Sequence, residues 1–119
     1  MRTLGTLALA AALSLLLTSS PAQDPVKVDP QHYKVVLEND QVRVLRITYA
    51  PGAQSVMHDH PHAVAVFLTE HVVKFNFPDG KSQTVTAKAG EAVWTAAGKH
   101  LPENTGARPF ELILVEVKE

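Results

Sequence analysis

The sequence predicts an all-β domain, a sandwich or small barrel built from about eight short strands. From residue 32 to the end, no stretch of eleven residues shows the spacing of apolar side chains that marks a helix. Instead, short runs of β-branched and aromatic residues are separated by proline, glycine, asparagine and aspartate. This pattern is typical of strands connected by turns.

The expected strands are residues 33–38, 42–49, 55–58, 63–69, 72–77, 83–87, 92–95 and 109–117. The clearest hairpin follows residues 72–77, where Val73, Phe75 and Phe77 alternate with polar residues and run into Pro78-Asp79-Gly80. The final strand is apolar on both faces. We therefore expect it to lie in the middle of the fold rather than at an edge.

The N-terminus predicts export. Arg2 precedes a mainly apolar run over residues 4–17, and small residues follow up to Ala22. This run is short for a membrane span, which needs about 20 residues, but suits a secretory signal peptide. We expect residues 1–22 to be a signal peptide, residues 23–31 an N-terminal arm and residues 32–119 the domain. The predicted destination is the periplasm or the outside of the cell, with no membrane partner after cleavage.

Composition gives no indication of several other partners. The formal net charge is −1, and nothing in this balance suggests nucleic acid or an anionic membrane as a partner. The chain has no cysteine, so an exported domain of this length must be held together by a packed β core.

Residues 58–62, His-Asp-His-Pro-His, hold half of the six histidines in the chain. Side chains at i and i+2 of a strand point to the same face, so His58 and His60 can aim at one point while Asp59 faces away. Two imidazoles directed at one point suit a first-row transition metal. His62 could supply a further nitrogen, but Pro61 is expected to bend the strand.

A third ligand must come from elsewhere in the chain. His100 is the best candidate, because it follows a strand and the turn residue Gly98. His32, in the arm, and His71, at an expected hairpin tip, are weaker candidates.

Two stretches resemble the motifs of the cupin superfamily. Residues 52–60, Gly-Ala-Gln-Ser-Val-Met-His-Asp-His, are similar to the opening of the first motif, and Gly90, Gly98, His100 and Asn104 resemble the second. The resemblance extends over about residues 42–117. It implies a double-stranded β-helix, the cupin jelly-roll barrel. It also implies that His58, His60 and His100 bind a divalent transition metal, which could be iron, manganese, zinc, copper or nickel.

The sequence departs from the cupin pattern in two places. The glutamate that usually follows the second histidine is absent, and Val64 and Ala65 stand in its two possible positions. Of these, we expect Val64 to face the interior. The second motif has Ala96 in place of proline and one residue fewer between its glycine and histidine.

Other interpretations of these residues remain. The clustered histidines could form a solvated loop or shape a metal-free pocket. The aromatic residues are expected in the core, although they could also line the mouth of a barrel: Phe67, Phe75, Phe77 and Trp94. Asn104 is expected to brace its turn. The acidic residues near the histidines, including Glu70 and Glu103, are expected at the surface, and no nucleophilic triad is evident.

Three functions are compatible with the sequence. The first is a metal-dependent dioxygenase acting on a small molecule, because sites of three neutral histidines resemble those of thiol dioxygenases. The second is a non-catalytic module that binds a metal or small ligand. The third is a metal-free structural or interaction barrel, for which pairing through an edge strand would give a homodimer. The sequence identifies no catalytic residue.

Overall fold

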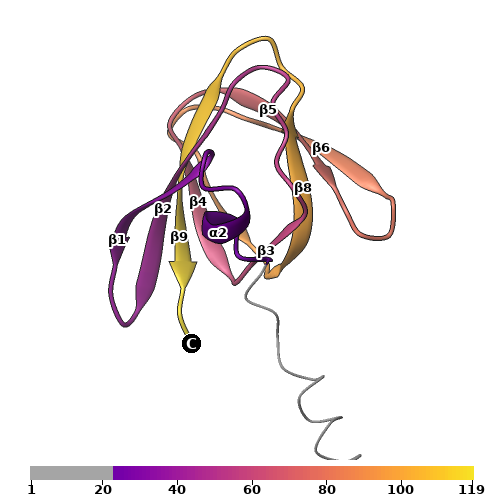
Figure 1. Ribbon diagram of the computed structural model, residues 1–119. Coiled ribbons are helices and arrows are strands. Elements are labelled where there is room, and N and C mark those ends of the chain that lie inside the picture. The colour runs from indigo at the N-terminus through magenta and orange to yellow at the C-terminus, as the bar shows by residue number, and fades with distance from the viewer. Residues whose placement is uncertain (1–22) are drawn as a thin grey trace, which may run out of the picture.

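The computed structural model describes residues 23–119, which form two antiparallel sheets curved around a common interior (Figure 1). The five-stranded sheet has the order β1-β2-β9-β4-β7, and the four-stranded sheet has the order β3-β8-β5-β6. The predicted signal peptide lies outside the described residues. The strands are β1 Tyr33–Glu38, β2 Val42–Tyr49, β3 His58–His60, β4 Ala63–Phe67, β5 His71–Asn76, β6 Ser82–Ala87, β7 Ala92–Thr95, β8 Gly98–Asn104 and β9 Phe110–Val117.

The predicted all-β architecture is confirmed, and most expected strands lie within two residues of their observed bounds. Two predictions near the histidines are wrong. Strand β3 begins at His58 instead of ending there, and β8 was missed altogether. Gly98 was predicted to be a turn residue, whereas it begins a strand that pairs with both β3 and β5.

Strand β9 lies in the middle of the larger sheet, as its two apolar faces predicted. It pairs with β2 along its full length and with β4 on its other side. Phe110 and Leu114 point into the core from β9, together with Tyr33, Leu45, Ile47, Tyr49 and Phe67 from neighbouring strands. The predicted hairpin is also confirmed, since β5 and β6 pair from His71 opposite Ala87 to Asn76 opposite Ser82.

Strand β4 has the opposite orientation to the one expected. Ala63, Ala65 and Phe67 are buried, whereas Val64 is only partly buried. The prediction that Val64 faces the interior is therefore wrong. Every residue of β4 is apolar, so hydrophobicity alone cannot fix which alternate set faces inward.

The N-terminal arm docks against the domain. Asp24 caps the short helix α2, Pro25–Val28, by accepting a hydrogen bond from the backbone of Val26 at 3.0 Å. Figure 1 shows α2 close to the open end of the barrel, where it contacts β1 and β3. None of the helices in residues 23–119 has the length and hydropathy needed to cross a membrane.

Candidate metal centre

Strands β3 and β8 bring three histidines together. The alternation on β3 buries His58 and His60 and exposes Asp59, as predicted. On the neighbouring strand, His100 lies directly opposite His58 in the pairing register. One ring nitrogen from each histidine lies within 4.8 Å of the others, which is close enough for all three to share one ion.

Hydrogen bonds determine which nitrogen two of the imidazoles present. Nδ1 of His60 donates to the carboxylate of Glu116 at 2.8 Å, and Nδ1 of His58 donates to the carbonyl of Val56 at 2.8 Å. Both acceptors require the proton on Nδ1, so Nε2 of each ring retains its lone pair. Nε2 of His100 is buried without a hydrogen-bond partner. The cluster therefore offers three Nε2 atoms as ligands.

The electrostatics also favour ligation. Burial lowers the pKa of His58 to about 4, and the adjacent His60 contributes to this shift. Burial lowers the pKa of His100 to about 3, with further contributions from the other two imidazoles. Both rings are neutral near pH 7, and an imidazole must be neutral to bind a metal. The donor set thus fits a first-row dication.

Glu116 is the principal residue of the site that sequence analysis missed. Its side chain is almost fully buried, and it accepts hydrogen bonds from His60 and from Nε of Arg43 at 2.6 Å. Burial alone would raise the pKa of Glu116, but the bonds from His60 and Arg43 hold it below its ordinary value. The expectation that all acids near the histidines lie at the surface is wrong. A signal was present, because Glu116 continues the inward-facing series of Phe110 and Leu114 on β9.

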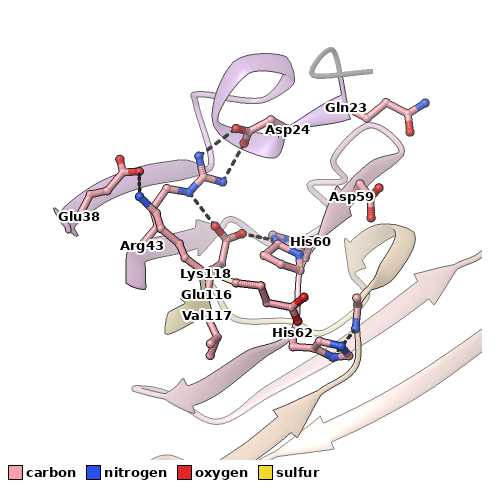
Figure 2. A pocket seen from close by; sticks show the side chains of 13 residues that line it. Gln23, Asp24, Glu38, Arg43, Asp59, His60, His62, Glu116, Val117 and Lys118 are labelled. Carbon is pink, nitrogen blue, oxygen red and sulfur yellow. Dashed lines mark hydrogen bonds and ion pairs between the residues drawn. The ribbon is translucent and has the colours of Figure 1, made fainter. Parts of the chain in front are cut away.

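The arm completes the network behind His60. Arg43 donates from both terminal nitrogens to the carboxylate of Asp24, each at 2.9 Å (Figure 2). Figure 2 shows the resulting order of contacts, from Asp24 through Arg43 and Glu116 to His60. Because Nδ1 of His60 donates to a carboxylate that is itself fixed, the imidazole is held in one orientation and one tautomer.

A second arm carboxylate supports His58. The hydroxyl of Ser55 donates to Asp29 at 2.6 Å and lies 3.2 Å from Nδ1 of His58. On the other side of the ring, the hydroxyl of Tyr33 lies 3.2 Å from Nε2 of His58 and 2.6 Å from the hydroxyl of Tyr49. Burial raises the pKa of both tyrosines, so these hydroxyls remain protonated near neutral pH.

The other three histidines lie outside this cluster. His62 accepts a hydrogen bond from the backbone of Ala97 at 3.3 Å and stacks on Trp94. His32 bonds to Asp29. His71 is buried, which contrasts with the exposed hairpin tip expected for it.

A cavity of about 620 Å³ opens beside the cluster and includes His60 and His100 in its wall. Most of the wall is aromatic or aliphatic, and no aspartate or glutamate among the described residues lines it. Phe67 is in the core, whereas Trp94 is 61% exposed at the cavity wall, which fits the alternative position at the mouth of the barrel rather than the core. Asn104 braces its turn as expected, donating to the carbonyls of Tyr49 and Arg108.

Solved structures provide the comparison. No protein-family model matches the sequence, and no curated protein matches it. A cupin domain from Bordetella pertussis Tohama I matches with a TM-score of 0.68 and 25% identity over 73% of this chain and 92% of that one. A double-stranded β-helix protein from Klebsiella pneumoniae matches with a TM-score of 0.58 and 24% identity over 71% and 74%.

A third match is the polyketide cyclase RemF from Streptomyces resistomycificus, with a TM-score of 0.54 and 16% identity over 73% of this chain and 64% of that one. The Klebsiella and Streptomyces matches demonstrate the shared fold alone. Together with the sequence motifs and the two-sheet topology, the Bordetella match identifies the chain as a member of the cupin superfamily.

Proposed function

We propose that this protein is an exported cupin that binds one divalent transition metal through His58, His60 and His100. The observation that carries the proposal is the convergence of three buried ring nitrogens within 4.8 Å. The unpartnered Nε2 of His100 gives further support, since a buried polar atom without a partner is unfavourable unless a ligand completes it.

A bound dication would act as a Lewis acid and offer open positions to a small molecule. The chain itself supplies the surroundings. Glu116 fixes the orientation of His60, and Asp29 acts on His58 through Ser55. The apolar cavity beside the cluster would exclude bulk water and admit a small molecule to the metal.

Two roles remain for this site. A metal-dependent dioxygenase would use the tyrosine pair, because the hydroxyl of Tyr33 lies beside Nε2 of His58 and can donate a hydrogen bond to a molecule bound there. A non-catalytic metal or ligand-binding module is favoured by a different observation: the described cavity wall carries no carboxylate that could act as a general base.

Metal analysis tests the shared part of the proposal. Protein purified from its native compartment without a chelating resin should contain about one equivalent of one dication. His100→Ala should lower this content strongly, whereas the matched variant His32→Ala, outside the cluster, should retain it. Equal metal content in both variants, or none in the native protein, would refute the three-histidine site. Oxygen consumption with small thiols and diketones then separates enzyme from binder.

Export is tested separately. The signal-peptide prediction places the mature N-terminus at Gln23, and the arm that docks beside the cluster begins there. Intact-mass measurement of the exported protein should give a chain starting at or near Gln23. Recovery of a soluble exported form that still begins at Met1 would count against cleavage.

A further inference from the structure

His71 is a buried titratable side chain that has no role in the proposed metal centre. Its side chain is 5% exposed, and its ring packs between Phe67, at a centroid distance of 4.6 Å, and Phe110, at 4.2 Å. Nδ1 is buried without a hydrogen-bond partner. Two aromatic neighbours and an unsatisfied nitrogen form an unfavourable environment for an imidazole that has only a packing role.

The position of His71 suggests a different role. It lines the same cavity of about 620 Å³ as His60 and His100. The pairing of β5 with β8 sets Val73 opposite Asn104 and Asn76 opposite Leu101. His71 therefore lies at the end of this strand pair away from His100, at a separation of about 20 Å along the strands. The cavity thus has the three-histidine cluster toward one end and a single imidazole toward the other.

The wall between these two ends defines the chemistry of the occupant. Aromatic side chains contribute much of it, from Tyr33, Tyr49, Phe67, Phe75, Phe77 and Phe110. Lys99 is the single residue with a formal charge among the described lining residues, and it is exposed. Away from Lys99, a carboxylate or an ammonium group against this wall would have no partner of opposite charge, which is strongly unfavourable. A neutral molecule with an aromatic or otherwise apolar body matches the wall.

We propose that His71 is a ligand-recognition residue, and that the cavity binds a neutral, largely aromatic molecule whose hydroxyl or carbonyl group forms a hydrogen bond with His71. Burial lowers the pKa of His71, so the ring is neutral and has one donor and one acceptor nitrogen. A ligand hydroxyl or carbonyl can pair with such a ring without introducing charge. This proposal rests on the small-molecule role of the barrel but not on bound metal.

The test compares two probes of similar shape, 4-ethylphenol and 4-ethyltoluene, which differ by a hydroxyl in place of a methyl group. Dissociation constants are measured by ligand-observed NMR, with the full mature chain both metal-free and metal-loaded. The native protein should prefer the phenol about tenfold, the effect of roughly one hydrogen bond to a buried group. In the metal-free protein, the anion 4-ethylbenzoate should bind more weakly than the phenol. Binding of neither neutral probe, or preference for the anion in the metal-free protein, would overturn the ligand class.

Variants assign the preference to His71. His71→Phe should remove it while retaining or improving affinity for 4-ethyltoluene, and His71→Gln, which keeps hydrogen-bonding groups, should restore part of it. Gln83→Leu is the matched control, because Gln83 is another polar side chain of the same wall. Loss of the preference in Gln83→Leu, or its persistence in His71→Phe, would overturn the role of His71. Metal content is measured in parallel, so a failed metal proposal is distinguished from a failed ligand proposal.

Discussion

The carboxylate of Glu116 accepts a hydrogen bond from Nδ1 of His60 at 2.8 Å, although the two residues are 56 positions apart in the chain. The bond brings a negative charge to the cluster in a cupin whose usual glutamate ligand is absent. Glu116 is also paired with Arg43, so the carboxylate is fixed on both sides. It therefore orients the imidazole of His60 from behind.

Glu116→Gln should weaken metal binding about tenfold or more, because partners behind a metal-binding histidine typically contribute 10–100-fold to affinity. Isothermal titration with Zn²⁺ or Co²⁺ measures the change. Glu111→Gln is the matched control, since Glu111 lies on the same strand but pairs with Arg46 on the outer surface. Equal affinities in the two variants would mean that Glu116 has no influence on the cluster.

Ala65→Glu and Val64→Glu test the vacant glutamate position. Ala65 is buried in the cavity wall, whereas Val64 faces outward. In metal-free protein, Ala65→Glu should lower stability by about 3 kcal/mol, because it buries an unpaired carboxylate, and added metal should restore much of the loss. Val64→Glu should show neither effect. The measurement is the thermal unfolding midpoint with and without Zn²⁺, and a metal-independent loss in Ala65→Glu would exclude ligation from this position.

The metal-free protein should lose stability as the pH falls from about 6.5 toward 4. The pKa values of His58, about 4, and His100, about 3, lie below the ordinary value of 6.5, so the unfolded chain takes up protons first as the solution becomes acidic. Proton uptake by the unfolded state favours unfolding throughout this window, and stability should be nearly constant above it. The lowered pKa values of Asp24 and Glu116 add a further loss at lower pH.

Urea unfolding midpoints measured across this pH range check the prediction. His100→Gln should give a shallower decline, because it removes one group that titrates on unfolding. A native profile with no slope between pH 6.5 and 4 would contradict the burial of neutral imidazoles, since 6.5 and about 4 are the unfolded and folded pKa values of His58.

Loss of the arm should weaken the metal site. Asp24 acts through Arg43 and Glu116 on His60, and Asp29 acts through Ser55 on His58. A chain starting at residue 32 should therefore bind Zn²⁺ more weakly than the chain starting at Gln23.

A point variant separates this effect from general loss of packing. Asp29→Asn should lower Zn²⁺ affinity several-fold with a small change in unfolding midpoint. Asp40→Asn, at an exposed turn, is the control. Unchanged affinity in both Asp29→Asn and the shortened chain would show that the arm does not support the site.

Local patterns in the sequence determined most of the fold and the identity of the three clustered histidines. Alternation within β5 fixed its faces, the two apolar faces of β9 placed it in the middle of the fold, and the i, i+2 spacing placed His58 and His60 on one side of β3. These features depend on neighbouring residues, so they can be predicted without knowledge of distant contacts. The orientation of β4 could not be predicted, because both of its faces are apolar.

The tertiary structure decided what surrounds the histidines. The pairing of β3 with β8 brings His100 opposite His58, and the position of β9 between β2 and β4 brings Glu116 behind His60. The alternation of β9 indicates that Glu116 faces inward, but its partners could not be predicted from the sequence, and a carboxylate is buried only when partners from other strands compensate the loss of hydration. Arg43 and His60 become those partners only when β2, β3 and β9 have assembled. The hydrogen bonds that hold the clustered histidines in place therefore depend on the folded chain, whereas the three histidines themselves could be identified from the sequence.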